Sequence, residues 1–196
     1  MGARQGRSPE SLLDTHVARP SVLPRAEGPS DLYGLELDNK KYRYLLTRDL
    51  TQTTIGRTCL FIMLNPSTAT QSDNDPTVRR CIGFATDWGY DSLIVTNICP
   101  TRATDPKEII DNLPPPLVVQ HENLKVIRHH AQRAHLVVTA WGEHGKTHGF
   151  AFAVDRVLSA LDIPIFCLGR NKSGAPKHPL YLRKDSELQL YLGRKV

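Results

Sequence analysis

The stretch that decides the fold runs from Thr58 to Leu64 and reads Thr-Cys-Leu-Phe-Ile-Met-Leu. A run of this length without alternating polar residues predicts a β-strand buried on both faces, as in a parallel sheet covered by helices. Similar apolar runs follow at residues 92–97, 135–141 and 163–168. The sequence therefore predicts four buried strands, with 58–64 as the first of them.

Helix signals fill the intervals between these strands. Asp75 followed by Pro76 is typical of a helix start, with Asp as the N-cap and Pro as the first helical residue, and Asp105-Pro106 repeats it. Further helices are expected over residues 118–134 and 150–161. This alternation of strand and helix predicts an α/β fold, a three-layer α/β/α sandwich with a central four-stranded parallel sheet.

The chain has 196 residues, which suits one domain with a tail. Residues 1–30 contain four prolines and no apolar period, so we expect a disordered N-terminal tail there. Residues 31–196 are expected to form a single α/β domain. Residues 42–47 are rich in aromatic and aliphatic side chains, which predicts an additional strand near the start of that domain.

Composition excludes several classes of protein. No apolar run approaches the ~18 residues that a transmembrane helix needs, and no secretory signal pattern is present. We therefore expect a cytoplasmic protein without membrane contact. The cysteines stand apart from one another, which favours buried thiols and predicts neither metal nor cofactor. They are Cys59, Cys81, Cys99 and Cys167.

The net charge of +5 is unevenly distributed along the chain. Residues 1–100 are balanced, and the window 170–184 contains five basic residues and no acidic one. Such a basic segment predicts a surface that contacts phosphates. The alternative is a solvated loop whose charges have no specific role.

Polar or aromatic side chains follow each predicted strand. Asn65, Asn97 and Trp141 come at or after the first three strands, and His178 lies beyond the fourth. The carboxyl ends of parallel strands meet at one edge of a sheet, so we expect these four residues to lie together. Each has an ordinary structural explanation alone, as a turn or core residue. Their joint placement favours a pocket for a planar base.

These segments resemble a small, largely uncharacterised domain family of bacteria and phages, over roughly residues 42–190. The segments that carry the resemblance are Leu64-Asn65-Pro66-Ser67-Thr68-Ala69, Asp75-Pro76-Thr77, Asn97, Arg102-Ala103-Thr104, Trp141-Gly142 and His178-Pro179-Leu180-Tyr181.

More distantly, the layout is similar to the uracil-DNA glycosylase superfamily. There the first strand ends in Gly-x-Asn-Pro or Gly-x-Asp-Pro, which handles the attacking water and resembles Met63-Leu64-Asn65-Pro66. The second strand ends in an Asn that reads the flipped base, and a late His-Pro-Ser motif stabilises the leaving base. Asn97 and His178-Pro179 resemble these two motifs. Leu180 and Arg183 stand where that last motif has serines, so uracil is not implied as the base.

The resemblance and the residue chemistry together predict a DNA glycosylase that hydrolyses the N-glycosidic bond of a damaged or modified base flipped out of DNA. His178 is expected to stabilise the departing base, and Asn65 to orient the attacking water. Two carboxylates beyond Asn65 could assist, Asp73 and Asp75; Asp75 is better explained as a helix cap, so Asp73 is the candidate general base. Asn97 and Trp141 are the expected base-binding residues.

The expected partner is DNA, bound by a monomer. Leu182 stands where the superfamily places the wedge side chain that replaces a flipped base. Phosphate contacts are expected from Ser67, Lys172, Ser173, Lys177, Arg183 and Lys184. DNA repair and defence against phages with modified genomes are both compatible with this activity.

Two other functions fit the same residues. The first is a hydrolase or transferase that acts on free nucleosides or nucleotides. The second is a nucleic-acid-binding module of the same fold without catalysis, which Asn65 favours because an amide is a poor base.

Overall fold

A computed structural model describes residues 41–52, 56–70 and 72–193. The strands are β1 (Leu46–Asp49), β2 (Thr58–Met63), β3 (Ser92–Asn97), β4 (Leu136–Thr139), β5 (Ile165–Cys167) and β6 (Gln189–Leu192). The α-helices are α3 (Pro76–Asp87), α4 (Pro106–Asp111), α5 (Leu117–Ala131) and α6 (Phe150–Ser159). Two short 3₁₀ segments are η1 (Glu143–Gly149) and η2 (Pro179–Tyr181).

The strands form one mixed sheet in the order β1-β3-β2-β4-β5-β6. The four predicted strands are its neighbouring parallel members, β3, β2, β4 and β5. β1 pairs antiparallel with β3 at one edge, and β6 pairs antiparallel with β5 at the other. The α/β class is confirmed, but the sheet is mixed and six-stranded, since an antiparallel strand at each edge extends the four parallel strands that the sequence predicted.

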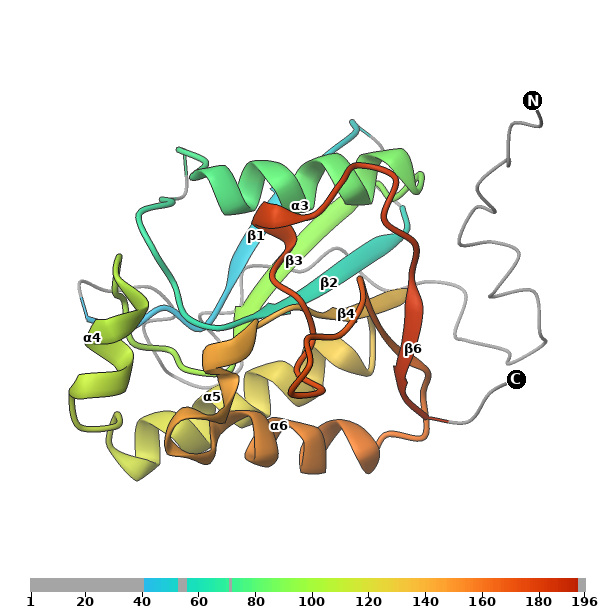
Figure 1. Cartoon of the computed structure of the whole chain (residues 1–196). Coiled ribbons are helices and arrows are strands. Elements are labelled where there is room, and N and C mark those ends of the chain that lie inside the picture. The colour runs from blue at the N-terminus through green and yellow to red at the C-terminus, as the bar shows by residue number, and fades with distance from the viewer. Residues whose placement is uncertain (1–40, 53–55, 71, 194–196) are drawn as a thin grey trace.

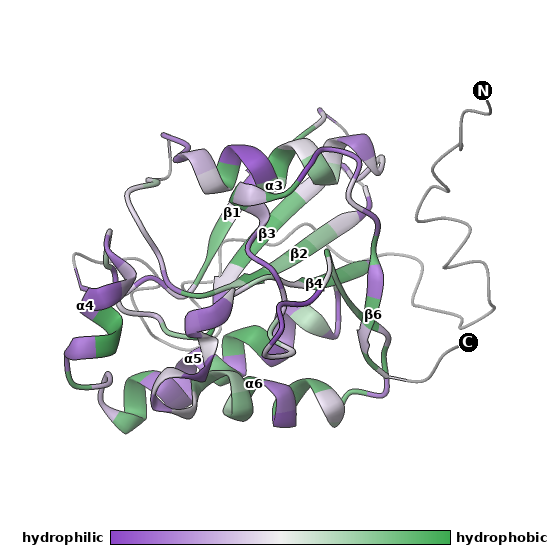
Figure 2. Ribbon diagram, viewed as in Figure 1, coloured by the Kyte–Doolittle hydropathy of each residue, from purple (hydrophilic) through white to green (hydrophobic). Residues whose placement is uncertain are grey.

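Helices cover both faces of the sheet (Figure 1), with α3 on one side and α5 and α6 on the other. Alternate residues of β2 separate the two cores: Leu60 and Ile62 pack in the cluster that contains α5 and α6, whereas Phe61 and Met63 pack with α3. Figure 2 shows the central strands as largely apolar and the helices as mixed. A strand buried on both faces needs apolar residues throughout, which explains the uninterrupted run in the sequence.

The predicted strand limits are accurate in the middle of the sheet and too long on one side. β2 and β3 match their predicted ranges closely. β4 is shorter than 135–141, because the chain leaves the sheet ahead of Trp141. β5 begins only at Ile165, since Pro164 has no N–H to donate to a neighbouring strand.

Both Asp-Pro signals start helices as predicted. The Asp75 carboxylate accepts a hydrogen bond of 2.7 Å from the Val78 N–H, with Pro76 as the first residue of α3. Asp105 caps α4 in the same way and forms a capping box with Glu108. These caps fix the direction in which each chain segment enters its helix.

The predicted tail, residues 1–30, and the start of the predicted domain lie outside the described residues. Among residues 41–52, 56–70 and 72–193, no helix combines the length and apolarity required to cross a membrane. The four cysteines are buried free thiols, as expected.

Candidate functional site

A pocket of about 630 Å³ opens at the carboxyl ends of the parallel strands. It is formed by the segments that follow β2, β3 and β4, by the segment 171–182 beyond β5, and by the start of α3. Seven residues predicted for the site line it: Asn65, Ser67, Asn97, Trp141, Lys177, His178 and Leu182. The parallel order of the strands therefore brings together residues from four separate parts of the chain.

Five other predicted residues lie outside this lining: Asp73, Lys172, Ser173, Arg183 and Lys184. Asp73 is exposed, and its Oδ2 accepts hydrogen bonds from the Thr70 and Ser72 hydroxyls, both at 3.1 Å. Its carboxylate thus closes a local turn, and the structure does not bring it to the pocket.

Asn65 presents a carbonyl oxygen to the pocket. Its Nδ2 donates to the backbone oxygens of Pro66, at 2.9 Å, and of Ala103, at 2.8 Å. Both amide protons are therefore engaged, which fixes the orientation of the side chain. Oδ1 accepts no hydrogen bond from the described residues, so it remains available to a water molecule.

Asn97 offers both a donor and an acceptor. It is the last residue of β3 and is buried, and its amide makes no hydrogen bond to any described residue. Its backbone oxygen accepts from Asn123 Nδ2 at 2.8 Å, which anchors this end of the strand. A buried, unengaged amide at a pocket wall suits recognition of a ring edge that carries a donor beside an acceptor.

His178 has one ring nitrogen engaged in a hydrogen bond. Its Nδ1 accepts a hydrogen bond of 3.4 Å from the Leu180 N–H at the start of η2. Burial lowers the pKa of His178, and the charge of Asp75 opposes that lowering only in part. Because Nδ1 acts as the acceptor, the proton of the neutral ring is on Nε2, which makes Nε2–H a donor.

Trp141 belongs to the wall of the pocket. Only 2% of it is exposed, and it packs edge-to-face on Tyr191 with ring centroids 5.6 Å apart. A Cβ at Gly145 would lie 2.0 Å from its Cδ1, so glycine is required there. This burial limits Trp141 to an edge contact with a ligand.

The loops after β4 and β5 are joined at the pocket. Gly142 has φ = +76°, a conformation that favours glycine, and its N–H donates to the Pro176 oxygen at 2.9 Å. This bond holds the Trp141 segment beside the segment that carries His178.

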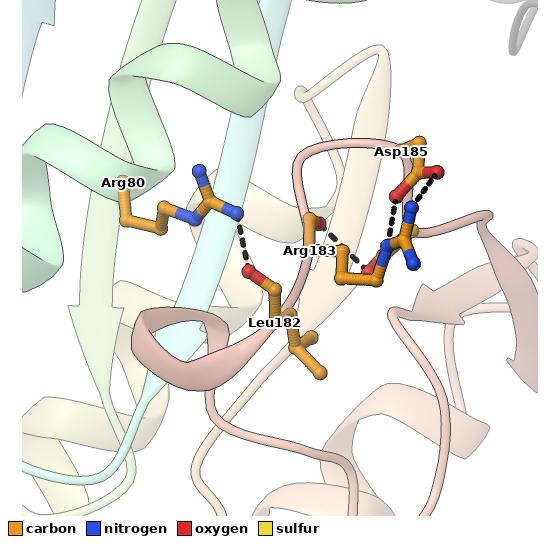
Figure 3. Close-up of polar contacts among 5 residues, drawn as sticks. Arg80, Leu182, Arg183 and Asp185 are labelled. Carbon is orange, nitrogen blue, oxygen red and sulfur yellow. Dashed lines mark hydrogen bonds and ion pairs between the residues drawn. The ribbon is translucent and has the colours of Figure 1, made fainter.

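Tyr181 is a pocket residue that the sequence analysis missed. It is 85% exposed, and its ring centroid lies 6.0 Å from that of His178. Leu182, the predicted wedge, is half-buried and packs partly against the core. Figure 3 shows Arg80 of α3 donating to the Leu182 carbonyl, which fixes the end of η2 on that helix. The more prominent side chain at the mouth is thus Tyr181.

The basic segment is partly neutralised by neighbouring carboxylates. Arg183 forms a bidentate pair with Asp185 at 2.9 and 3.0 Å (Figure 3), and Lys184 lies 3.3 Å from Asp87. Lys172 and Lys177 are exposed and form no ion pair with the described residues. These two lysines are the cations best placed to contact a phosphate.

Two further pocket residues were not predicted for the site. Arg43 is buried and donates through Nη1 to the Ala69 oxygen, which holds the loop after β2. Asp75 was weighed beside Asp73 as an assisting carboxylate and assigned as a helix cap. The sequence carries no signal that Arg43 faces the pocket, because its place depends on how the loop between Asn65 and α3 returns to the sheet.

In the part of the chain that the structure describes, no three His, Cys, Asp or Glu side chains are grouped so as to hold a metal ion.

The sequence of residues 43–180 matches a family model described as "Protein of unknown function (DUF1643)". No curated protein and no solved structure matches the chain.

Proposed function

Because this chain belongs to the DUF1643 family, whose function is unknown, we propose its activity from the pocket: it is a DNA glycosylase. It hydrolyses the N-glycosidic bond of a damaged or modified base flipped out of DNA and leaves an abasic site. The observation that carries the proposal is His178, with its Nδ1 engaged by the Leu180 N–H, in the same pocket as the unengaged Asn97 amide.

The difficult part of this reaction is the departure of the base with the electron pair of the N-glycosidic bond. A donor fixed near the oxygen where negative charge develops lowers that barrier, because it needs little reorganisation during the reaction. His178 Nε2–H supplies such a donor, and its ring is held by the bond between Nδ1 and the Leu180 N–H. Burial lowers the pKa of His178, which favours the neutral form of the ring.

The two asparagines supply the other polar functions of the reaction. Asn97 pairs with the edge of the base through its free donor and acceptor. Asn65 Oδ1 accepts a hydrogen bond from the water that attacks C1′ of the sugar. Its fixed amide nitrogen keeps that oxygen in place.

Contacts with DNA come from the mouth of the pocket. Lys172 and Lys177 provide positive charge for phosphates, and Tyr181 provides an exposed aromatic ring. Flipping a base costs a few kcal/mol, which stacking on such a ring offsets. The motif resemblance to the uracil-DNA glycosylase superfamily supports the same assignment. We further propose that the protein acts as a cytoplasmic monomer.

A non-catalytic nucleic-acid-binding module is the second candidate. It is favoured by Asn65, since an amide in the position closest to the attacking water cannot accept a proton. This alternative predicts DNA binding without base release.

The decisive experiment uses the 196-residue protein and labelled oligonucleotides, single-stranded and duplex. Each carries one uracil, hypoxanthine, hydroxymethyluracil, hydroxymethylcytosine or ethenocytosine, and alkali then cleaves abasic sites. We expect strand breaks at one or more of these bases, slowed on the order of 10²–10³-fold by His178→Ala. His121→Ala, on the exposed side of α5, is the control and should leave the rate unchanged.

Two results would contradict the proposal. Release of the base from free nucleosides alone would indicate a nucleoside hydrolase. A gel shift without strand breaks would favour the binding module.

A further inference from the structure

Asp75 places a buried carboxylate in the pocket wall. It is 9% exposed and lines the cavity, whereas the other acidic lining residue, Glu143, is exposed. One oxygen, Oδ1, accepts the Val78 N–H at 2.7 Å as the cap of α3. Oδ2 accepts no hydrogen bond from the described residues. One carboxylate oxygen therefore holds the helix and the other is available to a ligand.

The loop that carries Asp75 is held in position by the first strand. Arg48 of β1 donates to Asn74 Oδ1 at 2.7 Å and to the Thr70 oxygen at 2.5 Å. Just ahead of that strand, Arg43 donates to the Ala69 oxygen. These bonds fix several points between Asn65 and Asp75, so the carboxylate is preorganised at the pocket before any substrate arrives.

Asp75 also lies close enough to His178 to affect its protonation. Its negative charge raises the pKa of His178 against the larger lowering by burial. The same pocket therefore contains a carboxylate and a neutral imidazole donor that interact electrostatically. Pairs of groups with different environments are typical of sites in which one accepts a proton and the other stabilises charge.

The proposed hydrolysis requires a proton acceptor that the asparagines do not provide. Asn65 can orient a water molecule, but its amide does not take a proton at neutral pH. Asp73, the carboxylate suggested by the sequence, lies outside the pocket lining. The described residues thus leave one buried carboxylate for this role.

We propose that Asp75 is the general base of this reaction, an assignment that rests on the proposed glycosylase activity. Asn65 Oδ1 and Asp75 Oδ2 hold the attacking water between them. As the bond between C1′ and the base nitrogen breaks, its electron pair leaves with the base, whose oxygen accepts a hydrogen bond from His178 Nε2–H. The water oxygen bonds to C1′ and its proton passes to Asp75, which later returns it to the released base through solvent.

The test exploits the fact that Asn and Gly are also good helix caps. Asp75→Asn keeps the cap of α3 and removes the basic oxygen, so the thermal midpoint should change little. We expect its single-turnover rate of base release, on the oligonucleotide that the wild type cleaves best, to fall on the order of 10²–10⁴-fold. Asp105→Asn is the matched control, because Asp105 caps α4 in the same Asp-Pro motif outside the pocket lining.

A second variant separates chemistry from structure. Asp75→Gly keeps a tolerated cap and leaves space beside the water, so added sodium formate should restore part of the lost rate. A residue that only held the helix would show no such rescue.

The outcomes distinguish the two proposals. A wild-type protein that cleaves DNA, with Asp75→Asn within about twofold of its rate and no formate effect on Asp75→Gly, overturns the role of Asp75 alone. A wild-type protein that releases no base from any oligonucleotide overturns the glycosylase proposal, and the role of Asp75 with it.

Discussion

Tyr181 is a large aromatic residue that lines the pocket and yet is largely exposed to solvent. An aromatic ring that is 85% exposed beside the His178 imidazole is poorly explained by packing. We expect Tyr181→Ala to weaken binding of a base-modified oligonucleotide by about 1–3 kcal/mol, the usual contribution of one stacked base. Tyr181→Phe should retain most of the affinity, as measured by fluorescence anisotropy.

Leu182→Ala is the comparison for that measurement. Leu182 packs partly against the core, so its truncation should lower the thermal midpoint more than the affinity for DNA. The opposite ranking, with Leu182 dominating affinity, would make Leu182 the wedge after all.

Asn97 should decide which base is released. Asn97→Asp replaces an amide donor by an acceptor, so the preferred base should change along with the rate. The measurement is the relative single-turnover rate across the same set of oligonucleotides. A uniform loss at every base would mean that Asn97 only supports the end of β3.

At the scale of elements, β6 connects the edge of the sheet with the pocket wall. The Tyr191 hydroxyl donates to Asp155 Oδ2 at 3.1 Å, while Asp155 Oδ1 is buried and accepts no hydrogen bond from the residues that the structure describes. Tyr191→Phe would leave this half-buried carboxylate with neither bond, which should lower the free energy of unfolding by about 1–3 kcal/mol. Urea unfolding measures that change, and an unaltered midpoint would contradict it.

β6 is also a strand that could not be predicted from the sequence. The buried strands were predictable because each is an uninterrupted apolar run. β6 escaped prediction because it is short and half-buried, although Leu188, Leu190 and Leu192 alternate with polar or aromatic residues. Its apolar residues divide between the two cores, Leu188 and Leu190 packing on the side of α3 and Tyr191 and Leu192 on the other, so the short segment carries no clear period.

Some residues of the candidate site could also be predicted from the sequence, and others could not. Asn65, Asn97 and His178 were predictable because each follows a parallel strand, and topology alone brings such positions together. Asp75 and Arg43 were not, since their places depend on hydrogen bonds between a loop and the first strand. The sequence revealed the excess of basic residues in segment 170–184, but it did not reveal that Arg183 pairs with Asp185.

At the scale of the whole molecule, the paired charges change the expected salt dependence of DNA binding. Lys172→Ala with Lys177→Ala should flatten the log–log salt slope by up to about two. Arg183→Ala should change the slope little, because Asp185 already compensates its charge. Titration of binding against sodium chloride gives both slopes, and a larger effect from Arg183 would place the phosphates elsewhere.

Acid should destabilise the fold through His130. This side chain of α5 is buried, and burial, with His129 and Arg133 nearby, lowers its pKa to about 4. The unfolded chain takes up a proton near pH 6.5, whereas the folded one does so only near pH 4. The free energy of unfolding should therefore fall by up to about 3 kcal/mol as the pH drops between these values.

His130→Gln should reduce this pH dependence, as followed by urea unfolding at several pH values. His121→Gln on the exposed surface should retain it. Equal pH dependence in wild type and His130→Gln would assign the acid sensitivity to other groups.

Most of the pocket lining comes from the loops that follow the parallel strands, and the strands themselves contribute only their last residues. Evolution can therefore alter the target of the protein by exchanging one connection at a time, with little cost to folding. Segment 170–182 follows β5 and is fastened at two points, to α3 through Arg80 and to the loop after β4 through Gly142. Relatives that keep His178 and differ in the rest of this segment would share the scaffold and the pocket imidazole while presenting different side chains at the mouth of the pocket.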